Sequence, residues 1–259
     1  MTISPQTASN AVAAPRLTVG CNRFIAKLSA ASRLSDEEQQ AFADLCQDAR
    51  IVPAKRDLIS DGDKPDHFHI VLDGWLARYK VLDDGSRQIT AFLLPGDIGD
   101  LHGTILNRMD HGIVALTRAQ IAHVPHQVMQ DLPINRPDMS RALWRATLID
   151  EAILRSWIVN IGRRCAEKRI AHLFCELHAR LSLVGLVQDH RFTLPLTQEV
   201  IGDALGLTAV HVNRTLQVLR ERGVIVLERG ALMIEDVELL AKIGGFHADY
   251  LHPERLRRA

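Results

Sequence analysis

Several residues between Leu196 and Gly223 are of the types that read DNA bases, and they share one side of a short predicted helix. In the segment LTQEVIGDALGLTAVHVNRTLQVLRERG, the apolar residues Val212, Leu216 and Leu219 recur at helical spacing and form an inner side. The outer side carries Ala209, Val210, His211, Asn213, Arg214, Gln217 and Arg220. Arg binds guanine and Asn binds adenine through paired hydrogen bonds, whereas Ala or Val contacts the methyl group of thymine. The pattern predicts a helix that enters the major groove of DNA.

A helix-turn-helix is the unit that would present this outer side to DNA. Thr197 and Thr208 are suited to cap two successive helices, and Gly206 permits a left-handed turn between them. Gly202 is small where the two helices cross, and the following segment, VIVLERGALMIED, is typical of a two-stranded wing. The complete set favours a winged helix-turn-helix over a helical hairpin with no DNA-binding role. We expect Thr197, Gln198 and Thr208 to hold DNA phosphates through helix N-termini and hydroxyls.

A second chemistry could come from histidines in the first half of the chain. His67 and His69 lie two positions apart on a predicted strand, so both imidazoles face one side of it, and Asp73 and His102 follow. Two or three His with a carboxylate form a metal-binding set, as in metal-binding β-barrel enzymes of the cupin type. The spacing after Gly62 is one residue short of the cupin motif, and Asp replaces its Glu. We favour surface or pocket-lining histidines and no metal, and keep a cupin-like β-roll protein (a metal enzyme, or a metal or haem sensor) as the alternative.

These histidines belong to a stretch with the pattern of a compact β domain. Between residues 51 and 128, short apolar runs alternate with turn residues: LIS, FHIVL, WLARYKVL, QITAFLL, IVALT and QIAHV. Glycines recur at Gly62, Gly74, Gly85 and Gly96, with spacings of 12, 11 and 11 residues. The run DDGS around Gly85 is a strong hairpin signal because Asp-Gly supplies positive φ angles. Strands at this interval indicate a β-roll or jelly roll.

A long helix is predicted to connect this β domain to the helix-turn-helix. It starts after Pro137 and runs to about Asn160, with apolar residues on more than one side and Asp150 in the best heptad register. The segment Asn160-Ile161-Gly162 is expected to break it at a hinge. The fold class is therefore α+β, and we expect a disordered tail (1–20), a β-roll sensor domain (21–132), a dimerisation helix (133–161) and a winged helix-turn-helix domain (162–259).

Composition narrows the functional classes. Net charge is +0, so DNA binding must rest on a local basic patch rather than on a field of the whole molecule. The four cysteines show no CxxC pair, which favours reduced thiols in a cytoplasmic protein, and no apolar run approaches the about 20 residues that span a bilayer. There is no Gly-x-Ser-x-Gly elbow, P-loop or dinucleotide fingerprint. We predict a protein that is not an enzyme and has no membrane partner.

From Arg56 to Asp236 the chain resembles the cyclic-AMP receptor protein and fumarate-nitrate regulator (Crp/Fnr) family of transcription regulators. The resemblance rests on LISDGDKPDHFHIVLDGWLARYKVLDDGSRQITAFLLPGDIGDL and on LTQEVIGDALGLTAVHVNRTLQVL. It implies a homodimer held by the long helix, a cyclic-nucleotide-binding-like β-roll that shifts this helix, and double-stranded DNA and RNA polymerase as partners. The implied operator is a two-fold repeat whose half-sites lie about one helical turn, roughly 34 Å, apart.

The chain also departs from the family's pattern at its ligand positions. The family's base-reading positions correspond to Ala209, Val210, Asn213 and Arg214, and Val210 replaces a Glu that accepts a hydrogen bond from cytosine. The family's effector pocket corresponds to the segments Gly99-Asp100-Leu101 and His111-Gly112, without the Arg that pairs with a cyclic phosphate. Only two cysteines, Cys21 and Cys46, lie near the N-terminus, too few for an iron–sulfur cluster. We therefore expect neither cyclic AMP nor an iron–sulfur cluster, and the effector stays unknown.

Overall fold

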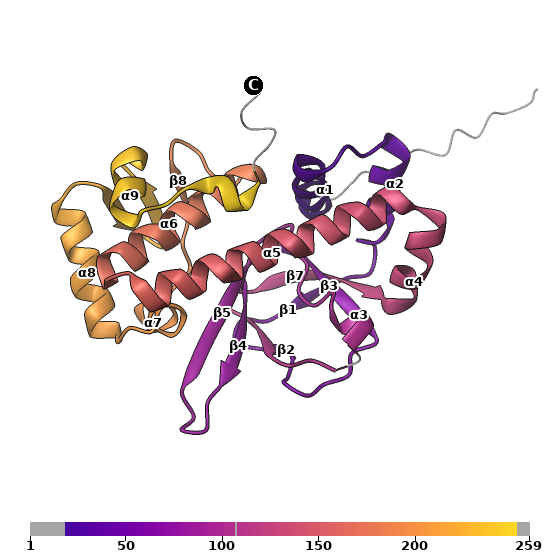
Figure 1. The fold of residues 1–259 in the computed structure, drawn as a ribbon, viewed down its shortest axis with the longest axis horizontal. Helices are drawn as coiled ribbons and strands as arrows, with labels where there is room; N and C mark the ends of the chain where they lie inside the picture. Colours follow the sequence, from indigo (N-terminus) through magenta and orange to yellow (C-terminus); the bar gives the residue numbers. More distant parts are fainter. Residues whose placement is uncertain (1–18, 107, 253–259) are drawn as a thin grey trace, which may run out of the picture.

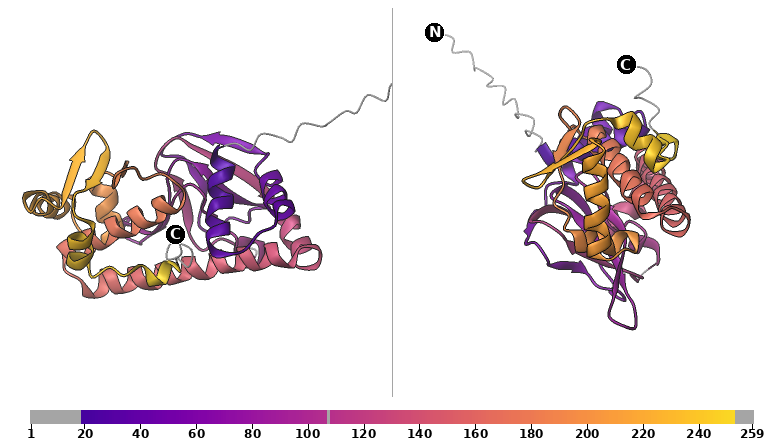
Figure 2. Two further views of the ribbon diagram at one scale, coloured as in Figure 1. Left: turned by 90° about the horizontal axis from the view of Figure 1, so that it is seen from above. Right: turned by 90° about the vertical axis from the view of Figure 1, so that its left-hand side faces the viewer.

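The structure, a computed structural model, describes residues 19–106 and 108–252, which form two lobes along one long helix (Figure 1). The predicted disordered tail falls almost wholly on residues 1–18 and therefore lies outside the described residues. The long helix, α5 (Pro137–Arg163), passes along both lobes. In the view from above, both lobes lie to one side of α5 (Figure 2, left). None of the helices in the described part of the chain is long and apolar enough to cross a membrane.

The N-terminal lobe is the predicted β-roll. Its two sheets have the strand orders β1-β7-β3 and β2-β6-β4-β5, with every named pair antiparallel. The strands are β1 (Ala49–Val52), β2 (Asp57–Ile59), β3 (His67–Asp73), β4 (Leu76–Val81), β5 (Arg87–Leu93), β6 (Gly112–Ala115) and β7 (Ala119–Pro125). All six apolar runs form strands as predicted, and the four regularly spaced glycines turn the chain with φ between 81° and 94°. Gly74 also has no space for a side chain, because a Cβ there would lie 2.6 Å from the carbonyl oxygen of Arg118.

Two short helices cover the roll at its N-terminal end. They are α1 (Val19–Ala31) and α2 (Asp36–Asp44). A capping box starts α2: the Ser35 hydroxyl accepts from the Glu38 amide, and the Glu38 carboxylate accepts from the Ser35 amide. Gly20 lets α1 approach β3 closely, since a Cβ there would lie 2.6 Å from the carbonyl oxygen of Leu72. Two further helices, α3 (Gly103–Leu106) and α4 (His126–Asn135), flank the roll before α5 begins.

The predicted break at Asn160-Ile161-Gly162 is wrong by a few residues. Helix α5 continues to Arg163, and the chain becomes extended only at Arg164, whose ψ is 148°. The buried Asn160 accepts the Arg164 amide with its carbonyl and donates from its side chain to the carbonyl of Arg169. Asn160 therefore joins α5 to the next helix rather than ending α5.

The C-terminal lobe is the predicted winged helix-turn-helix. It contains α6 (Ala166–Leu183), β8 (Arg191–Thr193), α7 (Gln198–Leu205), α8 (Ala209–Glu221), β9 (Ile225–Glu228), β10 (Ala231–Ile234), α9 (Val237–Gly244) and a 3-10 turn, η1 (Ala248–Leu251). The wing hairpin β9–β10 forms around Arg229-Gly230 as predicted, and β8 adds a third strand to it.

One hydrophobic core extends through both lobes. It includes Trp75 and Phe92 from the β-roll, Trp157 from α5 and Phe174 from α6, together with the apolar sides of α7, α8 and the wing. The Phe92 and Trp157 rings pack edge to face with centroids 5.6 Å apart. Two smaller cores lie within the β-roll lobe. The lobes are therefore packed against each other rather than tethered.

Candidate DNA interface and effector cavity

Helix α8 presents the predicted base-reading residues to solvent. Val212, Thr215, Leu216 and Leu219 are buried in the lobe. Val210, Asn213, Arg214 and Gln217 are exposed, while Ala209 and His211 are half-buried. Val210 is 81% exposed, the highest value among the large apolar residues of the described chain. An apolar side chain held in water at the start of a capped helix is available for a thymine methyl group, which polar readers cannot contact in this way.

The two threonines that were predicted as caps adopt that role. The Thr197 hydroxyl accepts from the Val200 amide and the Thr208 hydroxyl from the His211 amide, each at 3.2 Å. Gly206 ends α7 in the left-handed conformation with φ 64°, and a Cβ on Gly202 would lie 2.4 Å from the Leu207 carbonyl oxygen. The turn geometry therefore depends on both glycines. Thr197 and Thr208 are exposed at the two helix starts, where free backbone amides favour phosphate.

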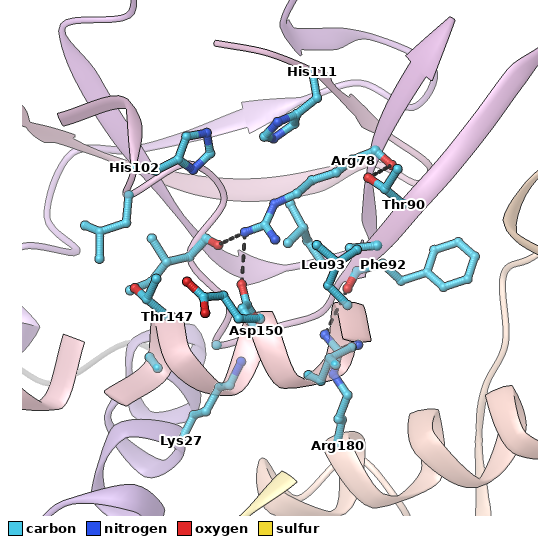
Figure 3. Close-up of a pocket in the computed structure, with 18 of the residues that line it drawn as sticks. Lys27, Arg78, Thr90, Phe92, Leu93, His102, His111, Thr147, Asp150 and Arg180 are labelled. Carbon is cyan, nitrogen blue, oxygen red and sulfur yellow. Dashed lines mark hydrogen bonds and ion pairs between the residues drawn. The ribbon is translucent and has the colours of Figure 1, made fainter. Parts of the chain in front are cut away.

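A cavity of about 480 Å³ lies between the β-roll and α5. Its polar lining comes from α1, β4, β5, the loops next to β6, α5 and α6 (Figure 3): Lys27, Arg78, Lys80, Thr90, His102, Asp110, His111, Thr147, Asp150, Glu151 and Arg180. The remaining lining is mainly apolar and includes Leu101, Leu106 and Leu154. A pocket of this size and mixed lining suits a small-molecule ligand.

The cations of the cavity are already paired. Arg78 donates to Asp150 of α5 at 3.0 Å and to the carbonyls of Gly99 and Ile98, each at 2.9 Å. Arg180 of α6 donates to Asp97 at 2.6 Å and to the Phe92 carbonyl at 2.9 Å. Both arginines therefore connect the β-roll to the helices that lead to the DNA-binding lobe. A charged effector would bind here by exchanging partners with these pairs.

Asp97 is the buried charge at the centre of this network. Lys27 and Arg180 both contact its carboxylate, and the Leu94 amide donates to it at 2.8 Å. Burial by itself would raise the pKa of Asp97, but the two cations outweigh burial and hold the pKa below its ordinary value. Asp97 is therefore a carboxylate at neutral pH.

The residues expected to form the effector pocket divide between the cavity and the scaffold. Leu101 and His111 line the cavity, whereas Gly99, Asp100 and Gly112 are not among its lining residues. Asp100 is fully buried and accepts from the His69 amide at 2.7 Å and from His69 Nδ1 at 2.8 Å. A Cβ on Gly112 would lie 2.5 Å from the Tyr79 ring. Asp100 and Gly112 thus hold the scaffold in place.

The candidate metal histidines do not come together as the sequence suggested. His67 and His69 lie on β3, next to His123 of β7, with the His69 and His123 rings 4.6 Å apart. Burial and the neighbouring His69 lower the pKa of His123 to about 4. His102 instead lies with Asp110 and His111 at the cavity, and among the described residues only these three place ligand atoms within 4.8 Å of one another.

Sequence reasoning missed most of the cavity. Its positive charge comes from α1, β4 and α6, three elements far apart in the chain, which contribute Lys27, Arg78, Lys80 and Arg180. The expected Leu101 and His111 do line it, and Asp150 was visible in the sequence as a carboxylate in the best heptad register of α5. Arg169, which could have attracted DNA, instead donates to the carbonyls of Arg164 and Leu205 and holds α6 against α7.

The comparisons with known proteins match both lobes. A model of the cyclic nucleotide-binding domain matches residues 49–134, and a model of the Crp-like helix-turn-helix domain matches residues 168–243. With the geometry above, these matches define a DNA-binding transcription regulator with a sensory β-roll. The nitrogen fixation regulation protein FixK of Bradyrhizobium diazoefficiens is 32% identical, over 71% of this chain and 78% of its own length. The chain therefore belongs to the Crp/Fnr family of transcription regulators.

Further relatives agree with this assignment. The transcriptional activator protein FnrL of Cereibacter sphaeroides is 28% identical over 81% of this chain and 86% of its own length. Among solved structures, FixK2 from Bradyrhizobium japonicum matches with a TM-score of 0.70 at 23% identity, covering 77% of this chain and 98% of that one. The expected fold class and family are confirmed, and the cupin-like alternative finds no support in these matches.

Proposed function

We propose that this protein is a homodimer that reads a two-fold symmetric operator through α8. The observation that carries the proposal is the exposed set Val210, Asn213, Arg214 and Gln217 on the first three turns of a helix whose other side is buried. Arg214 is the proposed guanine reader, Asn213 the adenine reader and Val210 the contact to a thymine methyl. His211 approaches the bases, and the exposed N-termini of α7 and α8, with Thr197, Gln198 and Thr208, hold the phosphates.

An apolar stripe on α5 supports the homodimer. Trp144, Leu148, Leu154, Ile158 and Val159 are between 45% and 65% exposed, although they are large and apolar. Residues at this spacing share one broad side of a helix, turned away from most of the buried residues Met139, Ile153 and Trp157. Leu154 lies at the edge of the stripe and also lines the cavity. The stripe is interrupted by the Glu151–Arg155 ion pair, with 3.4 Å between its charged atoms. An exposed apolar stripe of this length on a helix that both lobes leave open is suited to pairing with its own copy.

We further propose that the cavity is the effector site. Arg78 links its β-roll wall to Asp150 of α5, and Asp150 belongs to the helix that carries the apolar stripe. A ligand that separates Arg78 from Asp150 would change how α5 sits on the roll, and the two α8 helices of a dimer would move with it. Since the FnrL relative is named a transcriptional activator, we propose activation through contact with RNA polymerase.

The test is selection of bound duplexes from a random DNA pool with the purified full chain, alongside the Asn213→Ala/Arg214→Ala double variant. We expect enrichment of an inverted repeat whose half-sites are about one helical turn apart, and loss of this enrichment in the variant. An enriched single half-site would overturn the homodimer. Equal enrichment by the variant would overturn the assignment of α8 as reader.

A further inference from the structure

A cluster of three side chains of metal-ligand types, His102, Asp110 and His111, lies at the cavity. His102 directly precedes α3, while Asp110 and His111 directly precede β6. His111 Nδ1 lies 2.7 Å from the Asp110 carboxylate, and His102 Nε2 lies 4.0 Å from the same oxygen. The two imidazole rings are 5.1 Å apart (Figure 3). Two loops separated in the chain thus bring two imidazoles and one carboxylate to one point.

Each of the two imidazoles has one ring nitrogen without a hydrogen-bond partner among the described residues. Both His102 Nε2 and His111 Nε2 are buried and make no hydrogen bond among the described residues. Two buried ring nitrogens without partners are costly, because each has lost its water and gained nothing in return. The His111 atom nearest the Asp110 carboxylate is Nδ1, at 2.7 Å, and His102 Nε2 lies 4.0 Å from the same oxygen. A metal ion held at this point would therefore take His111 Nδ1, His102 Nε2 and the Asp110 carboxylate as its ligand atoms.

The basic side chains nearest the cluster do not pair with its carboxylate. Arg78 is paired with Asp150 at 3.0 Å. Lys80 is paired with Asp61 at 3.2 Å and also donates to the main-chain carbonyl of Asp110, not to its carboxylate.

We propose that His102, Asp110 and His111 bind one divalent transition-metal ion per chain. Two nitrogen donors and one oxygen donor suit Zn²⁺, Co²⁺, Ni²⁺ or Fe²⁺ rather than Mg²⁺ or Ca²⁺, which require mainly oxygen. Three protein ligands leave at least one coordination position open, and the cavity lies beside it. The ion would be accessible because Asp110 is largely exposed, with 80% of its side chain in solvent. The site stands on its own geometry and does not rest on the proposed operator or dimer.

The experiment is titration of the chelator-treated full chain with Co²⁺, followed by its visible absorption, and with Zn²⁺ in a calorimeter. The His102→Gln/His111→Gln variant removes the two nitrogen donors. His67→Gln is the matched control, because His67 also contacts a neighbouring carboxylate, Asp66 at 2.6 Å, but lies outside the cluster. We expect one Co²⁺ per chain with a ligand-field spectrum in the wild type and in the control. The double variant should bind at least about tenfold more weakly and lose the spectrum.

A second variant controls for the case in which the double variant loses Co²⁺ binding because it does not fold. Asp110→Asn changes an exposed side chain, so circular dichroism should match the wild type while the affinity for Co²⁺ falls. Zn²⁺ should also raise the melting temperature of the wild type by mass action and leave that of the double variant unchanged. The chain has 12 histidines, including His102 and His111. The same Co²⁺ affinity and spectrum in all four proteins would show that the ion binds at histidines outside the cluster and would overturn the site. Absence of stoichiometric binding at micromolar Co²⁺ would also overturn it.

Discussion

At the scale of single residues, Arg214 and Val210 determine what the reading helix can recognise. Both project from the first turns of α8, and nothing in the lobe covers either of them. An arginine that donates to guanine O6 and N7 discriminates guanine from the other bases at one base pair. Val210 can form no hydrogen bond with its side chain and can contact only an apolar group such as the thymine methyl. Specificity should therefore combine one guanine with one thymine in each half-site.

Arg214→Ala should weaken operator binding by about 1–3 kcal/mol and relax the base preference at one position of each half-site. Arg118→Ala is the control, since Arg118 is an exposed arginine between β6 and β7 of the β-roll, outside the reading helix. Fluorescence anisotropy with the selected operator and its single-base variants gives both quantities. A uniform loss across all operator sequences would instead assign Arg214 to a phosphate.

His172 makes the stability of the DNA-binding lobe dependent on pH. It is 2% exposed, packs its ring against Phe246, and its Nε2 lies 3.2 Å from the Ser156 hydroxyl. Burial, followed by the charge of Arg164, lowers its pKa from 6.5 to about 4. The unfolded chain therefore binds a proton in this range that the folded chain does not, so the stabilisation is complete above about pH 6.5 and declines as the pH falls toward 4.

His172→Gln should remove this part of the pH dependence. At about 1.4 kcal/mol for each pKa unit, wild-type protein should lose about 2 kcal/mol more than the variant between pH 7 and pH 5. Urea unfolding at the two pH values measures the free energy of unfolding of each protein. The contributions of the other buried histidines to its pH dependence cancel in the comparison, because both proteins contain them. Equal losses would show that another group is responsible.

Residue roles that depend on the local chain were predictable, and those that depend on tertiary contacts were not. The caps Thr197, Thr208 and Ser35 bond to amides three residues away, so their sequence neighbours define them. Arg78 and Asp150 are 72 positions apart, and periodicity carries no information about such a pair. The position of Asp100 in the family motif suggested a ligand-binding residue, but its carboxylate is instead hydrogen-bonded to His69.

At the scale of elements, strands and helix-turn-helix followed from the sequence, whereas the end of α5 did not. Period-2 runs between glycines define strands because each glycine adopts a positive φ that other residues resist. Gly162 looked like a helix breaker for the same reason. The interaction of Asn160 with Arg164 and Arg169 outweighs the small helical penalty of one glycine, about 1 kcal/mol, and α5 continues.

The apolar stripe of α5 gives the prediction at this scale. Leu148→Glu/Ile158→Glu should place two charges on each helix of the proposed dimer interface, shift the protein to monomer at micromolar concentration and weaken operator binding. Analytical ultracentrifugation reports the oligomeric state. Val81→Glu changes an equally exposed residue, 60% in solvent, on the β4–β5 hairpin and should leave the assembly intact. If the protein with both substitutions is still a dimer, the dimer interface does not lie on α5.

At the scale of the whole molecule, two kinds of ion pair connect the lobes. Arg180 is buried and joins α6 to Asp97 of the roll, with Glu176 contributing a second contact at 3.3 Å. Arg87 of β5 reaches Asp203 of α7 at 2.8 Å, but about a third of each side chain is exposed. The first pair is in a medium of low dielectric, where loss of Arg180 would leave Asp97 with Lys27 and would take from the buried Glu176 the cation that contacts it. The second pair is screened by water.

Arg180→Met should therefore lower the free energy of unfolding by about 3 kcal/mol or more, whereas Arg87→Ala should lower it by less than about 1 kcal/mol. Urea unfolding followed by circular dichroism compares the two variants directly. Similar small losses would mean that the Arg180 network adds little to the packing between the lobes.

The core shared by the two lobes also limits how this family can exchange its parts. Phe92 of the roll packs on Trp157 of α5, and both belong to one cluster with Phe174 of the DNA-binding lobe. A chimaera that joins this β-roll to the head of a relative would place side chains selected in two different proteins against each other at that contact. Sensor and reader of this chain therefore share one packed contact, and a new combination would need compensating changes around Phe92 before the chimaera folds as well as either parent.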